Sequence, residues 1–296
     1  MFCTQCGEKL SEDQKSCQSC GAPVITSTPK QMPGKVTSPW TLGRLSKYAI
    51  ISVIAISIIT ARLFMGGMGL MDNDAVHSND NGLKAMETGD FAGAAGHLEN
   101  AADSAASAPV KMTTLTNLGY VYASDGKNVA ALQSFKEALT YATENSSDYY
   151  LISGEINLLE GSPEEALQHY LEANKVLPDD FQINNALNLF YLDMNDEYPN
   201  YSDVKKALGY AMKAYQVTPN ETKSTARENL AIAYYINEDY TTAISYFKES
   251  EQNQPYIQLW LGMSYYALED YTTAQPYLQK ASDAGLTEAN QFLETY

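Results

Sequence analysis

Small and large apolar residues recur beyond residue 80 in a fixed order. A small residue is followed by a large one four positions later and by a second small one three positions after that, so all three share one face of a helix. The six occurrences are 37, 35, 41, 36 and 31 residues apart, which brackets a unit of about 34 residues. They are Ala94/Leu98/Ala101, Ala131/Phe135/Ala138, Ala166/Tyr170/Ala173, Ala207/Ala211/Ala214, Ala243/Phe247/Ser250 and Ala274/Leu278/Ala281.

A second pattern precedes each of these anchors by twelve residues. It reads Leu118-Gly119-x-x-Tyr122, Leu230-Ala231-x-x-Tyr234 and Leu261-Gly262-x-x-Tyr265, and Gly82, Gly154 and Asn188 hold the small position in the other units. Asn188 fits after allowance for about seven extra residues around Asn195 to Ser202. Small residues on one helix and large ones on the next let two antiparallel helices approach closely and interlock. Each unit is therefore predicted to be a pair of helices.

Short polar breaks separate the two predicted helices of a unit. Ser162-Pro163-Glu164-Glu165 is typical of a capping box with proline at the first helical position. After Gly285, the segment Thr287 to Thr295 is expected to form a closing helix over the end of the stack.

These patterns resemble the tetratricopeptide repeat over roughly residues 75 to 296. The resemblance implies an all-α fold, a solenoid of helix-turn-helix units over residues 72–296 with about six repeats and the closing helix. A solenoid buries each repeat against the next, so we expect one extended body.

An apolar segment precedes the repeats. From Tyr48 to Met71 the chain has 24 residues in which Arg62 is the sole charge, and about 20 apolar residues suffice to cross a bilayer. We therefore predict a transmembrane helix and its flank over residues 45–71, with a buried helix of a soluble protein as the alternative. Residues 23–44, rich in Pro, Ser and Thr, are predicted to be an extended linker.

All four cysteines lie within the first 20 residues, as Cys3-x-x-Cys6-Gly7 and Cys17-x-x-Cys20-Gly21. Four thiolates suit the closed tetrahedral coordination of a structural Zn(II), and metal binding would supply the folding free energy that so short a segment lacks. Two disulfides or a redox pair are the alternatives. Residues 1–22 resemble the zinc ribbons at the N-termini of many bacterial membrane proteins.

Charge is divided unevenly along the chain, whose formal net charge is -17. Residues 1–71 carry seven basic and three acidic side chains, whereas residues 72–296 carry 12 and 33. The positive-inside rule then predicts a cytoplasmic zinc ribbon and an extracytoplasmic repeat domain in a single-pass membrane protein, although Arg62 argues weakly for the reverse. Zinc thiolates also persist better in a reducing compartment. Nucleic-acid binding is not expected, because so acidic a chain repels phosphates.

The resemblance to tetratricopeptide repeats implies a concave groove lined by positions of each unit's first helix. Those positions are Asn117, Tyr120, Glu155, Glu228, Ile232, Tyr235, Met263 and Tyr266. A protein or peptide partner is expected there, and the acidic domain favours a basic one. The alternative is that most of these tyrosines pack the repeats together or are ordinary surface residues.

An enzymatic function is not expected. His77, His97 and His169 are isolated in the sequence, no nucleophile motif or phosphate-binding glycine loop is present, and the cysteine cluster leaves no open metal position. The leading hypothesis is a membrane-anchored interaction scaffold. The alternative is a transmembrane sensor that couples external ligand binding to the zinc ribbon, and a third arrangement places the repeats in the cytoplasm.

Overall fold

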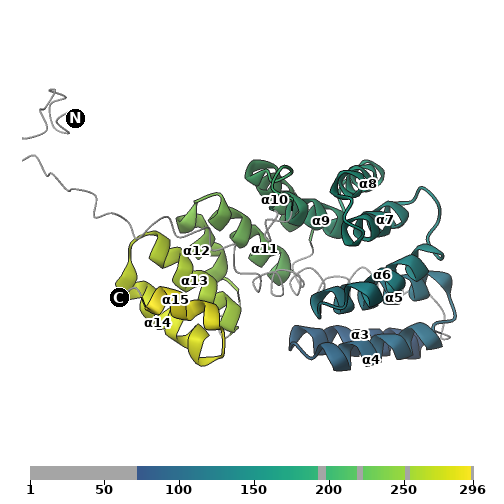
Figure 1. Ribbon diagram of the computed structural model, residues 1–296, viewed down its shortest axis with the longest axis horizontal. Coiled ribbons are helices and arrows are strands. Elements are labelled where there is room, and N and C mark those ends of the chain that lie inside the picture. Colours follow the sequence, from purple (N-terminus) through teal and green to yellow (C-terminus); the bar gives the residue numbers. More distant parts are fainter. Residues whose placement is uncertain (1–71, 193–197, 219–222, 251–253, 295–296) are drawn as a thin grey trace, which may run out of the picture. The chain divides into compact units, whose positions relative to one another are not determined.

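The computed structural model describes residues 72–192, 198–218, 223–250 and 254–294. Contacts divide the chain into Met1–Thr41 and Leu42–Tyr296, and every described residue belongs to the second unit. The expected zinc ribbon, linker and transmembrane helix lie outside the described residues. The elements are α3 (Asn73–Glu87), α4 (Phe91–Ser104), α5 (Ala108–Ser124), α6 (Asn128–Leu139), α7 (Ser147–Leu159), α8 (Pro163–Val176), α9 (Phe181–Leu192), α10 (Val204–Val217), α11 (Lys223–Ile236), α12 (Tyr240–Lys248), α13 (Pro255–Ala267), α14 (Tyr271–Asp283), the 3-10 helix η4 (Thr287–Ala289) and α15 (Asn290–Leu293) (Figure 1).

The helices pack in consecutive pairs. In each pair, a first helix (α3, α5, α7, α9, α11 or α13) lies against the second helix that follows it, and each second helix from α4 to α12 also contacts the next first helix. The described residues thus form an all-α helical solenoid of six hairpins, in agreement with the expectation from the sequence.

All eighteen anchor residues predicted from the sequence are buried, from Ala94 in α4 to Ala281 in α14. The fixed order of small and large residues therefore reports the packing face of the second helices. The reason is geometric, because positions four and three apart on a helix lie above one another on one face.

In five of the six hairpins, a small residue of the first helix stands opposite a large residue of the second helix. The large residue is sixteen positions further along the chain in each case. At Gly154 an added Cβ would lie 2.4 Å from Cε1 of Tyr170, and at Gly119 it would lie 2.7 Å from Cε1 of Phe135. Such separations are far below van der Waals contact, so a larger residue would push the helices apart. The remaining pairs in this register are Gly82/Leu98, Ala231/Phe247 and Gly262/Leu278.

The fourth hairpin reverses this arrangement of sizes. Asn188 of α9 stands where the other hairpins have Gly or Ala, and Ala211 of α10 stands where they have Leu, Phe or Tyr. The pair is 23 positions apart because the connection between the helices is longer by seven residues. Both residues are buried. Bulk lost from the second helix is thus replaced by bulk on the first.

The turns inside five hairpins share one backbone geometry. The first helix ends with a residue in the left-handed region, which is Gly89, Gly126 or Gly161 in the first three hairpins and Glu238 or Glu269 in the last two, at φ between 63° and 79°. The amide after it donates to a carbonyl five residues back, as from Lys127 to Tyr122 at 2.8 Å. This is the Schellman arrangement, which satisfies carbonyls at the end of the first helix.

Aspartates cap several second helices. Asp90, Asp239 and Asp270 each accept a hydrogen bond from the backbone N–H three residues ahead, at 2.9–3.2 Å. Ser162 was expected to do the same, but its side chain makes no capping bond. Ser162 and the three aspartates all have ψ near 70°. At this angle the longer aspartate side chain reaches the N–H, whereas the serine does not. Ser146 has ψ 166° and does cap α7. Pro163 does stand at the start of α8 as expected.

The C-terminal end of the last hairpin is covered by η4 and α15. Leu286, Ala289 and Phe292 are buried there. The Phe292 ring packs edge-on against Tyr266 of α13 at 5.3 Å between centroids, as Trp260 packs against Tyr235 one hairpin earlier at 5.2 Å. The closing segment therefore takes the place that the first helix of another repeat would occupy.

Candidate partner-binding surface

The residues predicted to line a groove lie on the first helices α5, α7, α11 and α13, and they divide into two groups. Tyr120, Glu155 and Tyr266 are half-buried and keep some exposed surface. The others pack inside the stack; these are Asn117, Glu228, Ile232, Tyr235 and Met263. The partner role stays a prediction, and the half-buried residues are the ones with surface available for it.

Asn117 joins two neighbouring hairpins. Its side-chain Nδ2 donates to Oδ1 of Asn79 in α3 at 2.9 Å. The same register positions in the fourth and fifth hairpins hold Asn185 and Asn229, whose amides are bonded at 2.6 Å. These two amide bridges, both buried, link first helices of successive units. A bridge of this kind fixes the register of one hairpin on the next.

Glu228 also connects two hairpins. Its carboxylate accepts a hydrogen bond from the Ser224 hydroxyl at 3.1 Å and from the Tyr256 hydroxyl of α13 at 2.5 Å. Tyr235 packs edge-on against Tyr240 and Trp260, and burial raises the pKa of its hydroxyl. Both side chains therefore hold the stack together.

The half-buried Glu155 lies between two phenols. The Tyr120 hydroxyl of α5 donates to Oε1 of Glu155 at 3.2 Å, and the Tyr170 hydroxyl of α8 donates to the same carboxylate. Burial raises the pKa of Glu155 to about 7, although the two phenol donors act in the opposite direction. The pKa of Tyr120 is raised by burial and by the negative charge of Glu155.

Two further carboxylates lie in this region, and the sequence did not single them out. The pKa of Asp148, on α7, is raised by loss of hydration and by the charge of Asp180. The pKa of Asp180, just before α9, is raised by burial. None of the ion pairs within the described part of the chain involves Asp148, Glu155 or Asp180. The three form an acidic group that no lysine or arginine of the described residues neutralises. Asp148 and Asp180 lie near helix starts, where a single Asp is too common a sequence feature to reveal such a group.

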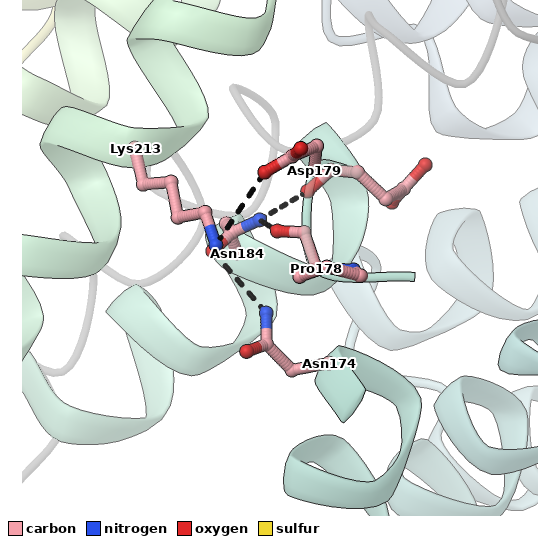
Figure 2. A network of polar contacts seen from close by, with 6 residues as sticks. Asn174, Pro178, Asp179, Asn184 and Lys213 are labelled. Atoms are coloured by element: carbon pink, nitrogen blue, oxygen red, sulfur yellow. Dashed lines mark hydrogen bonds and ion pairs between the residues drawn. The ribbon is translucent and has the colours of Figure 1, made fainter. Parts of the chain in front are cut away.

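A polar network holds Asp180 in place where α8, α9 and α10 meet. Figure 2 shows Asn184 of α9 between Asn174 of α8 and the loop before α9. Asn174 Nδ2 donates to Asn184 Oδ1 at 3.3 Å, and Asn184 Nδ2 donates to the Pro178 carbonyl at 2.8 Å. Lys213 Nζ of α10 lies 3.6 Å from Oδ1 of Asp179. The loop that carries Asp180 is thereby tied to three helices.

His77 and His97 lie on the two helices of the first hairpin, α3 and α4, and His169 lies on α8. No group of three or more His, Cys, Asp or Glu within the described ranges is placed to hold a metal ion.

Models of known families match three stretches of the chain. Residues 79–147 and residues 255–284 match models of the tetratricopeptide repeat. These two matches cover the first two helical hairpins and the last one. Residues 2–24, which contain all four cysteines, match a model of the zinc-ribbon domain. This match indicates zinc binding at the N-terminus. No curated protein matches the chain.

Solved structures resemble this chain at low sequence identity. A chain in the crystal structure of the APC/C hetero-tetramer Cut9-Hcn1 is 15% identical with a TM-score of 0.56, over 83% of this chain and 47% of that one. This protein thus spans about half of that chain's length. Pseudomonas aeruginosa pilF is 19% identical at a TM-score of 0.46, over 76% and 99%. A tetratricopeptide repeat protein from Parabacteroides merdae is 20% identical at 0.42, over 71% and 79%.

Tetratricopeptide repeats are generally modules that bind proteins, and the fold carries no catalytic constellation of its own. In the portion of the chain that the structure describes, no helix has both the length and the apolar character needed to span a bilayer. The segment from Tyr48 to Met71, which was expected to do so, is not part of that portion.

Proposed function

We propose that this chain is a membrane-anchored scaffold whose repeats bind a positively charged segment of a partner protein outside the cytoplasm, while a structural zinc ribbon folds on the cytoplasmic side. The positive charge of the partner is inferred from the group formed by Asp148, Glu155 and Asp180, which no lysine or arginine of the described residues neutralises. Loss of hydration raises the pKa of all three carboxyl groups, and at Asp148 the charge of Asp180 adds to it. A lysine or arginine brought by a partner would stabilise their ionised forms.

The membrane anchor and its orientation rest on the sequence. The apolar segment from Tyr48 to Met71 is long enough to cross a bilayer, and the basic residues lie on its N-terminal side. The zinc ribbon rests on Cys3, Cys6, Cys17 and Cys20 together with the family match over residues 2–24.

Charge reversal tests the partner surface. A photoreactive residue at position 148 in intact cells should capture a protein, and purification of that protein allows its affinity to be measured. Asp148→Lys combined with Asp180→Lys should weaken binding at least tenfold, because like charges would then face the partner. Glu164→Lys with Glu165→Lys makes the same change in net charge on the exposed start of α8 and should have little effect. Equal losses in both double variants would contradict a specific surface.

Protease accessibility tests the orientation. In intact cells stripped of their wall, an external protease should digest the repeats and leave the N-terminal ribbon protected. Protected repeats would establish the reversed topology, with different partners within reach.

Metal analysis of the purified full-length chain tests the ribbon. Zinc should co-purify with the wild type, and Cys3→Ser with Cys17→Ser should lose it, since two ligands would be missing. Zinc retained by that double variant would place the metal elsewhere.

A further inference from the structure

Glu155 of α7 lies at a junction between two hairpins. The neighbouring Gly154 lets a side chain of α8 approach the Glu155 carboxylate. Because Gly154 has no side chain, the ring of Tyr170 lies directly against α7, and its hydroxyl reaches the Glu155 carboxylate. The second phenol comes from the preceding hairpin, since Tyr120 of α5 donates at 3.2 Å. The Tyr120 ring is itself held edge-on against Phe135 of α6 at 5.1 Å. One carboxyl group thus joins α5, α7 and α8.

Among the described residues, no cation pairs with this carboxylate. On α6, Lys136 pairs at 2.6 Å with Glu160, just after the end of α7. On α8, the ring of His169 packs against Tyr150 of α7 at 6.0 Å between centroids. Each of these groups is engaged with a residue other than Glu155.

The remaining titratable neighbours are acidic or phenolic. Asp180 precedes α9 and interacts unfavourably with the ionised forms of Tyr120 and Asp148. Tyr198, in the long connection after α9, interacts with Tyr170 and donates to the Leu158 carbonyl of α7 at 3.3 Å. Ionisation of Glu155 therefore adds a negative charge to a region that already lacks compensation.

We propose that Glu155 is a proton-controlled clamp, which holds α5, α7 and α8 together when its carboxyl is protonated and loosens their junction when it is ionised. The proposal requires no partner and does not depend on the function proposed above. A protonated carboxyl shares hydrogen bonds with both phenols and carries no charge. An ionised one needs more hydration than its partly covered position in the junction allows, so it favours local opening.

The direction of the pH dependence follows from linkage. The pKa of Glu155 is about 7 in the closed junction, against 4.5 for the same group in solution. The closed state therefore binds the proton more tightly, its stability is greatest below pH 4.5, and that stability is lost as the pH rises to about 7. Opening becomes up to tenfold more frequent per pH unit in this window, which amounts to about fortyfold between pH 5 and pH 7, and it levels off above the window.

Hydrogen exchange of the purified full-length chain tests the clamp. Exchange of amides in α5 and α7 would be measured from pH 5 to pH 8.5 and corrected for the intrinsic pH dependence of exchange. The corrected opening should rise with pH in the wild type, and Glu155→Gln should remove most of that rise, because an amide cannot ionise. Tyr120→Phe should move the midpoint to higher pH, since the carboxylate loses a donor.

Two variants serve as controls. His169→Gln should leave the rise unchanged, which separates Glu155 from an imidazole, a group that in general titrates in the same range. Glu164→Gln, exposed on α8, should also leave it unchanged. Opening that is independent of pH in the wild type, or a full rise kept by Glu155→Gln, would overturn the proposal. A rise abolished by His169→Gln would overturn it equally.

Discussion

At the scale of single residues, two asparagines of α9 show how differently one side chain can act in one helix. Asn185 and Asn188 are both completely buried. Asn185 accepts a hydrogen bond from Asn229 in the next hairpin, whereas neither amide atom of Asn188 has a partner among the described residues. A buried polar group without a hydrogen bond costs about 1–3 kcal/mol, so Asn188 contributes bulk and its polarity is a burden.

Replacement of each asparagine by leucine separates these roles. Asn188→Leu should raise the free energy of unfolding by roughly 1 kcal/mol, because leucine has the same number and branching of side-chain heavy atoms and brings no polar atoms. Asn185→Leu should lower it by about 1–3 kcal/mol, because Asn229 is then left buried without its acceptor. Urea-induced unfolding of the two purified variants measures both changes. The same sign of change in both would show that the interpretation of Asn188 is mistaken.

At the scale of the element, the turns show what a pattern in the sequence can and cannot convey. The polar breaks marked the position of every described turn within a hairpin except the long fourth one, because these segments interrupt the apolar face. The conformation at each turn's end follows from Gly89, Gly126 and Gly161, which adopt positive φ at little cost. Nothing in the residue type of Glu238 or Glu269 announces the same conformation. The backbone of the turn imposes it on them.

Glu269→Gly, and likewise Glu238→Gly, should therefore stabilise the protein. A left-handed conformation costs a residue with a Cβ about 1–2 kcal/mol, and glycine's greater freedom in the unfolded chain offsets part of the gain. We expect a net increase of roughly 0.5–1 kcal/mol in the free energy of unfolding, measured by urea denaturation. Gly126→Ala is the matched reverse change, because φ is 74° and an added Cβ meets no atom within 4 Å. A loss of about 1 kcal/mol there would confirm that backbone conformation alone decides the effect.

At the scale of the whole molecule, the sequence predicted the hairpins more fully than the candidate site. Periodicity within one segment identifies the face that packs inside its own hairpin, and every anchor residue was found buried. It does not reveal which of the other positions the next hairpin covers. Asn117, Glu228 and Met263 were placed in a groove by resemblance, and in the structure their neighbours bury them. The group formed by Asp148, Glu155 and Asp180 depends on contacts between hairpins, so it emerges only from the fold.

The closing segment gives a prediction at this scale. Phe292→Ala should lower the free energy of unfolding by up to about 3 kcal/mol, because a buried ring that covers the last hairpin is lost. Hydrogen exchange should increase most in α13 and α14, which lie under it. Gln291→Ala changes the exposed residue beside it and should have little effect. Undiminished protection in α13 and α14 of the Phe292 variant would show that the end of the stack needs no cover.

The reversed sizes at Asn188 and Ala211 also limit how such a protein can be rearranged. If recombination moved α9 into another hairpin, its asparagine would collide with an aromatic ring or a leucine. If α7 were set opposite α10, glycine would face alanine across a void. The two helices and their long connection must therefore be inherited or transplanted as a single cassette, whereas the other five hairpins share a common small-to-large register. Gene shuffling that respects this boundary should yield folded chimeras, and shuffling that cuts through it should not.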